Sequence, residues 1–306
     1  MTDTTTPGTH IEVELASQPS CWAEAVAAGP GHVGALPAPG ERVAVVGCGT
    51  SLYVARAYSA LREASGAGET DAFAASEYRD GRRYDRVVAI SRSGTTTEIL
   101  DVLARIASRD EPPTIVAITA DGATPIAALA DDVVELDVAA ERSVVQTRFP
   151  TTVLAMLRAS LGEDLGAVVE AAAGAVTSSL PVAAGDVRQI TFLGSGWASA
   201  IAEEAALKCR EAAGFWTESY PAMEYRHGPV SVSGPGTVVW VFGDAPPGLH
   251  GDVEATGAQF VCDDLDPLVD LIRAQRLAVE LARHAGRDPD RPHALSFSVV
   301  LDGDRR

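Results

Sequence analysis

The sequence has little lysine, no run of basic residues and no long apolar segment. Its formal net charge is −18, which argues against a nucleic-acid partner because phosphate binding requires clustered lysine and arginine. No apolar run approaches the length of a membrane span, so we expect no membrane partner either. The first ten residues are rich in threonine and lack the apolar stretch of a secretory signal. We therefore expect a cytoplasmic protein.

The four cysteines also lack a recognisable pattern. Cys21, Cys48, Cys209 and Cys262 are scattered, with no Cys-x-x-Cys pair and no cluster with histidine. This spacing fits a reducing compartment and provides no zinc-binding motif. We expect no metal site.

Strand-like and helical patterns alternate along most of the chain, whose 306 residues suffice for two domains. A helical pattern at 9–28 and a Pro/Gly linker at 35–41 come first. Short apolar segments then alternate with helical ones, which predicts an α/β fold with a parallel sheet and helices on both faces. The expected strands are 42–47, 71–78, 86–90, 113–119 and 132–136, and the expected helices are 53–65, 96–108, 124–130 and 147–161.

The alternation restarts after residue 185. Residues 189–214 repeat the form of residues 42–66, which is a strand, a Gly-x-Gly turn, a helix and a final glycine. Such a weak duplication predicts two similar flavodoxin-like units, each with a parallel sheet flanked by helices. The expected organisation is a tail and helix at 1–34, a first domain at 35–164, a helical linker at 165–184 and a second domain at 185–306.

Residues 90–100, "ISRSGTTTEIL", place five hydroxyl side chains at a strand-to-helix turn. The first amides of a helix are unpaired and the positive end of its dipole favours anions, while Gly94 allows close approach of the backbone. One serine or threonine would be a helix cap, but five at the carboxyl end of a parallel strand favour an anion site. The turn therefore predicts a phosphate cradle made without lysine.

Residues 47–51, "GCGTS", form a second Gly-containing turn. They do not continue as a dinucleotide fingerprint, because the sixth position is Leu52 here and Ser199 in the second copy. We interpret the motif as a tight turn that exposes Thr50 and Ser51 at a helix N-terminus. A plain turn with a capping serine explains this motif equally well.

One helix of the second half carries charges on a single face. Glu204, Lys208 and Glu211 are spaced i, i+4 and i+7, which a solvated stripe of ion pairs would also explain. The segment that follows, "ESYPAMEYRHGP", contains helix breakers, two aromatic residues and His227. A carboxylate with a nearby histidine can move a proton between adjacent sugar carbons and open a sugar ring, although His227 could also be an ordinary loop histidine.

Five motifs, "GCGTS", "ISRSGTTTE", "ERSVVQTR", "EEAALKCRE" and "MEYRHGP", occur in an order and at spacings that resemble the double sugar-isomerase (SIS) domain proteins. The resemblance runs from about residue 9 to the C-terminus and is strongest to the isomerase half of glucosamine-6-phosphate synthase and to amino-sugar-phosphate deaminase/isomerases. It implies two tandem SIS units in a homodimeric enzyme without a cofactor. The implied partner is a sugar phosphate or amino-sugar phosphate, isomerised by proton transfer.

The resemblance also implies roles for individual residues. Glu211 would be the isomerising base with Lys208 beside it, and His227 the ring-opening group, which in the family often reaches a neighbouring subunit's site. The implied substrate-binding residues are Cys48, Gly49, Thr50, Ser51, Ser91, Arg92, Ser93, Thr96, Val144, Gln146, Glu204 and Ser296.

The chain departs from the family pattern in three places. Only about forty residues precede the first strand, so we do not expect a glutamine-fed synthase. Arg92 stands where glutamine is more usual and could add a bidentate phosphate contact. The tail at 288–302, "DPDRPHALSFSVVLD", has Phe297 where many members carry an imine-forming lysine, so no such imine is expected. The missing lysine leaves open a non-catalytic sugar-phosphate sensor, although the presence of both Glu211 and His227 disfavours it.

Overall fold

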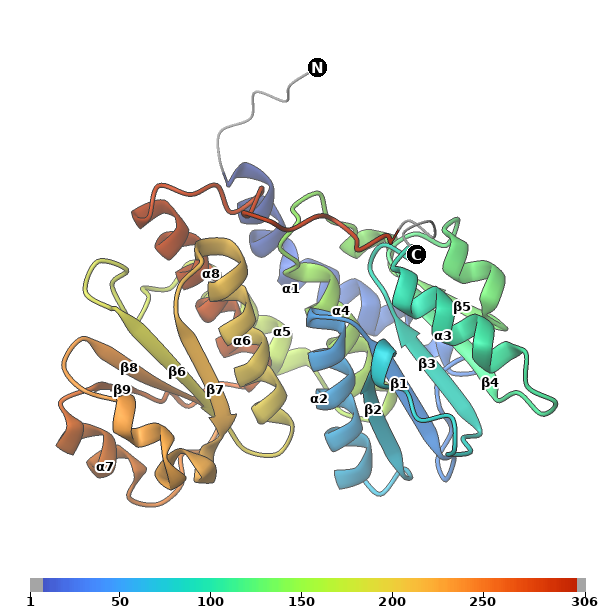
Figure 1. Ribbon diagram of the computed structural model, residues 1–306, viewed down its shortest axis with the longest axis horizontal. Coiled ribbons are helices and arrows are strands. Elements are labelled where there is room, and N and C mark those ends of the chain that lie inside the picture. The colour runs from blue at the N-terminus through green and yellow to red at the C-terminus, as the bar shows by residue number, and fades with distance from the viewer. Residues whose placement is uncertain (1–7, 302–306) are drawn as a thin grey trace. The chain divides into compact units, whose positions relative to one another are not determined.

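The computed structural model (Figure 1) describes residues 8–301, which divide into two compact units. The first-sheet unit comprises Ser20–Ala140, Arg148–Leu165 and residues 296–301, and the second-sheet unit comprises residues 8–19, Glu141–Thr147 and Gly166–Leu295. The long helix α1 (Thr9–His32) is divided between them after Pro19. The domain boundaries expected at 35, 165 and 185 stay predictions, and residues 1–7 of the expected tail lie outside the described residues.

The first-sheet unit contains a five-stranded parallel sheet in the order β2-β1-β3-β4-β5, which is the flavodoxin-like order. The central strands are apolar except for Arg86 at the start of β3 and the threonines at the two ends of β4, because the sheet is covered on both faces. Alternate residues such as Ala44, Val87 and Ala117 pack in one core cluster with the buried side of α3. The strands are β1 (Val43–Gly47), β2 (Thr70–Ala74), β3 (Arg86–Ile90), β4 (Thr114–Thr119) and β5 (Asp132–Glu135).

The described part of this unit also contains residues 20–32 of α1 and the helices α2, α3 and α4. Helix α2 (Thr50–Ala64) packs against α4 (Arg148–Ser160) and against the sheet. The helix α3 (Thr97–Ala107) begins seven residues after β3 ends. Segment 124–130, expected as a short helix, is a 3-10 turn, η2 (Pro125–Leu129), and the strand expected at 71–78 ends at Ala74 in another, η1 (Ala75–Glu77). A third such turn is η3 (Asp137–Ala139).

The second-sheet unit contains a four-stranded parallel sheet in the order β7-β6-β8-β9. This order equals that of the first four strands of the other sheet, so the expected α/β fold of two parallel sheets flanked by helices is confirmed. The strands are β6 (Gln189–Gly194), β7 (Thr217–Pro221), β8 (Thr237–Phe242) and β9 (Gln259–Val261).

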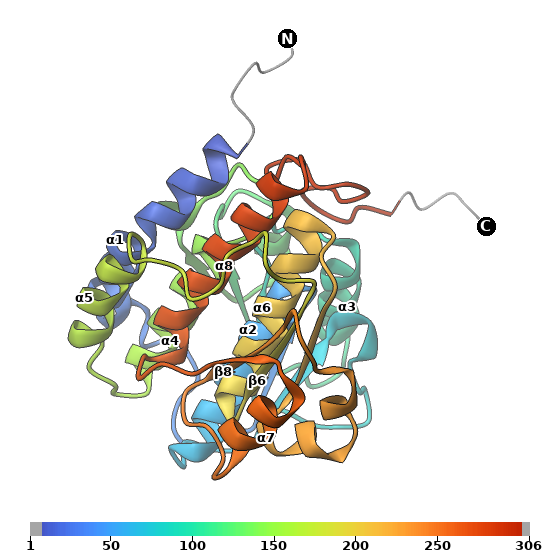
Figure 2. The ribbon, with the colours of Figure 1, turned by 90° about the vertical axis from the view of Figure 1, so that its left-hand side faces the viewer.

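Helices α6 (Trp197–Ala213) and α8 (Pro267–His284) pack side by side in this unit, as Figure 2 shows. Helix α5 (Gly166–Ala175) packs against α8, and α7 (Leu249–Thr256) against β9. Two 3-10 turns, η4 (Ala222–His227) and η5 (Pro229–Val232), follow β7. Among the described residues, no helix is long and apolar enough to cross a membrane.

Candidate functional site

The turn between β1 and α2 is made tight by glycine. A Cβ on Gly47 would lie 2.5 Å from the backbone of Ser51, and Gly49 adopts φ 55°, a left-handed value that favours glycine. Because β1 and α2 abut, Thr50 and Ser51 are only 2% and 3% exposed, so the expectation that the turn exposes them is wrong. Cys48 lies beside them, and burial raises the pKa of its thiol.

The hydroxyl turn between β3 and α3 leaves the same edge of the sheet, because Gly47 at the end of β1 is in register with Ile90 at the end of β3. The Ser91 hydroxyl accepts a hydrogen bond from the Gly94 amide at 3.2 Å. Gly94 has φ 60°, and a Cβ there would lie 1.9 Å from the Thr124 hydroxyl oxygen. The expected turn therefore forms, and glycine is required within it.

The C-terminal segment of residues 296–301, which we call the strap, lies across this turn (Figure 1). Its Ser298 Oγ accepts hydrogen bonds from Ser93 Oγ at 3.1 Å and Thr95 Oγ1 at 2.9 Å, and it lies 3.5 Å from Thr96 Oγ1. Ser296, a predicted binding residue, is exposed and donates to the Ser298 carbonyl at 2.8 Å.

Arg92, expected as a phosphate contact, holds the strap in this structure. Its Nη2 donates to the Phe297 carbonyl at 2.8 Å, and its guanidinium carbon lies 3.8 Å from the centre of the Phe297 ring. Arg92 and Phe297, the two residues at which the sequence departs from the expected pattern, are therefore direct partners. Sequence reasoning missed this pairing because it joins residues 205 positions apart.

The second-sheet unit carries the charged cluster on α6. Lys208, the only lysine in the sequence, donates to Glu211 Oε2 at 2.5 Å, and its Nζ lies 3.4 Å from Glu204 Oε1. The side chains of Lys208 and Glu204 are 1% and 3% exposed, whereas that of Glu211 is 21% exposed. The spacing is thus a buried ion cluster rather than a solvated stripe, and Glu211 is its member open to a ligand.

Lys208 is charged in spite of its burial. Burial by itself would lower the pKa of Lys208, but Glu204, Glu211 and then Glu141 raise it above its ordinary value. The carboxyl groups of Glu204, Glu211 and Glu141 thus lie around one buried ammonium.

Segment Glu141–Thr147, which contains the predicted pocket residues Val144 and Gln146, is held by two buried carboxylates. Glu141 Oε1 accepts hydrogen bonds from the amide and hydroxyl of Thr147, at 2.5 and 3.1 Å. Glu14 Oε1, from α1, accepts from the amides of Arg142 and Ser143, at 2.5 and 3.2 Å. Sequence reasoning missed both glutamates, although Glu141 opens the quoted "ERSVVQTR" motif.

His227 ends the 3-10 turn η4 and is exposed. Its turn is anchored by buried Tyr225, whose hydroxyl donates to Ser233 Oγ at 2.7 Å, and by Arg226, which pairs with Asp252 at 2.6 Å. The backbone around His227 is therefore fixed while its imidazole faces outward.

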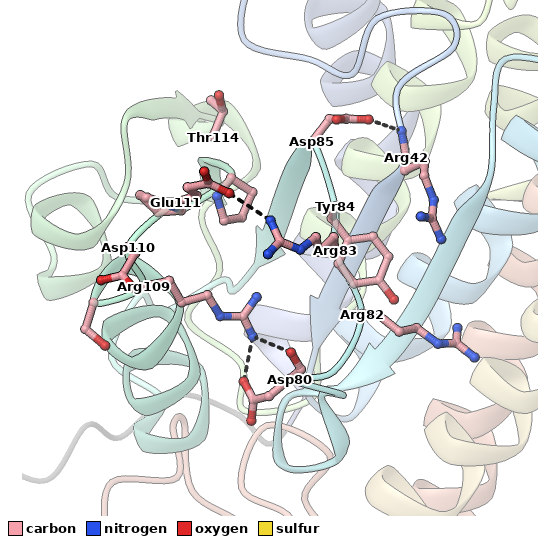
Figure 3. A pocket seen from close by; sticks show the side chains of 13 residues that line it. Arg42, Asp80, Arg82, Arg83, Tyr84, Asp85, Arg109, Asp110, Glu111 and Thr114 are labelled. Carbon is pink, nitrogen blue, oxygen red and sulfur yellow. Dashed lines mark hydrogen bonds and ion pairs between the residues drawn. The ribbon is translucent and has the colours of Figure 1, made fainter.

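A polar cavity of about 1030 Å³ lies at the opposite edge of the first sheet, before β1, β3 and β4 (Figure 3). Arg109 pairs with Asp80 at 2.7 Å, and Arg83 with Glu111 at 2.8 Å, so these charges neutralise one another. Open α/β sheets bind ligands at the carboxyl ends of their strands, where the two turns lie. The two turns are therefore a better candidate for a ligand site than this cavity.

The predicted site residues fall in both units. The first-sheet unit holds the residues of the two turns and Ser296, and the second-sheet unit holds Val144, Gln146, Glu204, Lys208, Glu211 and His227. Within the described residues, no three His, Cys, Asp or Glu side chains gather in a way that could hold a metal ion.

Comparison with known proteins finds similarity in both sequence and fold. The family model of the SIS domain matches residues 38–161. The isomerizing glutamine–fructose-6-phosphate aminotransferase of Methanothermobacter thermautotrophicus is 30% identical over 86% of this chain and 52% of its own length. The chain thus spans about half the length of the curated relatives that it matches along most of its sequence.

Solved structures share the fold along nearly the whole chain. Glucosamine-6-phosphate deaminase from Thermotoga maritima has a TM-score of 0.76 at 24% identity, covering 95% of this chain and 99% of that one. The tagatose-6-phosphate ketose/aldose isomerase of Escherichia coli has a TM-score of 0.77 at 19% identity, covering 97% and 99%. Residues 38–161 therefore match the SIS-domain model, and the whole chain has a fold similar to that of these solved phosphosugar proteins.

Proposed function

We propose that this chain is a phosphosugar isomerase or an amino-sugar-phosphate deaminase/isomerase, with its second sheet forming a second SIS domain. The observation that carries the proposal is the buried Lys208 ammonium, which donates at 2.5 Å to the accessible carboxylate of Glu211. The hydrogen bond from the buried ammonium fixes the position of this carboxylate, and a base must be positioned in this way to take a proton from a substrate. The relatives named above include both isomerases and a deaminase.

In the proposed reaction, Glu211 removes a proton from one sugar carbon and returns it to the adjacent one through an enediol or enolamine. His227 moves a proton between ring oxygen and solvent during ring opening, for which an imidazole suits neutral pH. The hydroxyl turn holds the phosphate. This proton transfer needs only the chain's own side chains.

We also propose that the chain acts as a homodimer in which His227 serves a neighbouring subunit. Its exposed imidazole on an anchored turn supports this role. Light scattering should show a dimer at micromolar concentration. A monomer with full activity would contradict the proposal.

One observation favours a second candidate, a non-catalytic sugar-phosphate sensor. Phe297 stands where the resemblance leads one to expect an imine-forming lysine, and a phenylalanine cannot form an imine. The carbonyl of Phe297 instead accepts a hydrogen bond from Arg92. A sensor would bind sugar phosphates without changing them.

The deciding experiment is incubation with a panel of hexose and hexosamine 6-phosphates in D₂O. Thermal shift identifies which compounds bind, and mass spectrometry and ammonia assays then identify products. We expect at least one binding compound to be interconverted, with deuterium at the carbon next to the carbonyl. Binding without exchange or products would favour the sensor.

A further inference from the structure

The strap makes unusually specific contacts for an exposed chain end. Phe297 is 43% exposed, and Val300 is 62% exposed, so its apolar side chains bury little surface. Its polar atoms, in contrast, meet side chains of the hydroxyl turn in hydrogen bonds of 2.8–3.1 Å. The strap is therefore held by polar contacts and by one ring over a guanidinium, and not by a hydrophobic core.

The donors that the strap engages are those that a phosphate would need. Ser93 and Thr95 both direct their hydroxyls at Ser298 Oγ. The amide of Thr97, in the first turn of α3, donates to the Val299 carbonyl at 3.1 Å. Helix N-terminal amides and clustered hydroxyls make an anion site, and here neutral oxygen atoms fill it.

Arg92 is the strongest of these donors. It is 3% exposed, and an arginine that is shielded from water is attracted more strongly to an aromatic face than an exposed one. Because its Nη2 bonds the Phe297 carbonyl, a phosphate that recruits Arg92 must compete with the strap for the same guanidinium.

We propose that residues 296–301 occupy the phosphate cradle of the free protein, and that a phosphate group binds by displacing Ser298 and taking over Arg92. The proposal rests on the proposed function only in taking the hydroxyl turn as the phosphate site. A phosphate forms charge-assisted hydrogen bonds, which are stronger than those of a hydroxyl or carbonyl oxygen, so it can displace the strap. The docked strap lowers the apparent phosphate affinity by the fraction of molecules whose cradle is open.

The test measures inorganic phosphate binding to the full chain by titration calorimetry. Phe297→Ala removes the ring over Arg92 and leaves the hydroxyl turn intact. We expect it to bind phosphate about fivefold more tightly than the parent, since loss of one cation–π contact should open the cradle by about that factor. Val300→Ala, on the same strap, is the matched control and should bind like the parent.

A second variant, Ser298→Ala, keeps the Phe297–Arg92 contact and removes the hydroxyl that accepts from Ser93 and Thr95. It should also bind phosphate more tightly. Weaker binding by either variant would show that the strap belongs to the phosphate site and would overturn the proposal, as would unchanged binding by both. If neither the parent nor the variants bind phosphate, the hydroxyl turn is not a phosphate site, and that part of the proposed function fails with it.

Amide hydrogen exchange can distinguish a strap that phosphate displaces from a strap that closes over bound phosphate. The Leu301 amide donates to Thr97 Oγ1 at 2.9 Å, so its exchange reports whether the strap is docked. Saturating phosphate should speed the exchange of the peptide that contains residue 301. Slower exchange would mean that the strap closes on phosphate, which contradicts displacement.

Discussion

The two units repeat one scaffold and use it differently. Gly47 and Gly194 end equivalent strands, and a Cβ on either would lie 2.5 or 2.2 Å from backbone atoms of the next helix. Gly49 and Gly196 then adopt almost the same conformation, with φ 55° and ψ −126° against φ 56° and ψ −129°. The strand-to-helix turn is thus the same structure twice, and the geometry of the turn alone does not determine what either unit does.

The differences begin at the side chains. Strand register matches the Ser-Arg-Ser-Gly of residues 91–94 with the Gly-Asp-Ala-Pro of residues 243–246, so the second unit has no hydroxyl cradle there. Conversely, the first unit lacks the charged cluster of α6. When the two turns are aligned, the positions of α2 that correspond to Glu204, Lys208 and Glu211 are apolar, namely Ala57, Leu61 and Ala64. Under the proposed function, the two copies of the fold have divided phosphate binding and proton transfer between them.

The largest expected effect tests the assignment of proton transfer to the second unit. Glu211→Gln keeps size and polarity but removes the base, so we expect kcat to fall by about 10²–10⁴-fold while sugar-phosphate binding changes little. Deuterium exchange into the substrate should fall equally. Glu203→Gln, on the same helix, is the control and should keep normal turnover. Near-normal turnover of Glu211→Gln would refute the assignment.

The second unit also differs in carrying a buried acid with a shifted titration. Burial raises the pKa of Asp270 to about 6, against hydrogen bonds from Trp240 at 2.7 Å and Arg273 at 2.9 Å. Between pH 6 and about 4 the folded state holds a proton that the unfolded state has released, so Asp270 contributes more to stability as the pH falls.

The corresponding prediction compares the parent with Asp270→Asn, which cannot titrate. As the pH falls from 7.5 to 4.5, the free energy of unfolding of the parent should rise relative to that of the variant, by about 2 kcal/mol. Denaturant unfolding at several pH values measures this difference. A difference that does not change with pH would mean that Asp270 titrates normally.

Most of the fold was predictable because buried parallel strands are continuous apolar runs. The strand β3 was predicted with its observed bounds, whereas β7 was missed because its sequence, TESYP, is polar at the edge of a sheet and was read as helix breakers. The helix α7 was also missed. The two glycine-containing turns and the shared helix face of Glu204, Lys208 and Glu211 were predictable, because glycine content and helical spacing are local signals. The strap and the Glu14 contacts were not predictable, because they join positions more than 120 residues apart without a local pattern.

A matched pair of glycine variants can distinguish an effect on the stability of the fold from an effect on phosphate binding. Gly47→Ala and Gly194→Ala should each destabilise the chain by about 1–3 kcal/mol, because each Cβ overlaps the start of the next helix. Only Gly47→Ala should also weaken inorganic phosphate binding, since its helix adjoins the cradle. Gly174→Ala, where a Cβ meets no described atom within 4 Å, is the control. Equal losses of phosphate binding in both variants would contradict the division of roles.

The smallest expected effect isolates a single phosphate contact. Thr96 Oγ1 lies 3.5 Å from Ser298 Oγ, farther than the Ser93 and Thr95 hydroxyls, so removing it disturbs the strap least. Thr96 is the N-cap of α3, and among the described residues its side chain accepts no capping hydrogen bond, so its replacement should change the free energy of unfolding by less than about 0.5 kcal/mol.

Thr96→Val keeps the branched shape of the side chain and loses one hydrogen-bond donor, worth about 1 kcal/mol, so KM for a sugar phosphate should rise about fivefold. Because that bond is the same in ground and transition states, kcat should not change. A fall in kcat at constant KM would place Thr96 in the chemical step instead. No change in either constant would mean that the Thr96 hydroxyl does not contact the phosphate.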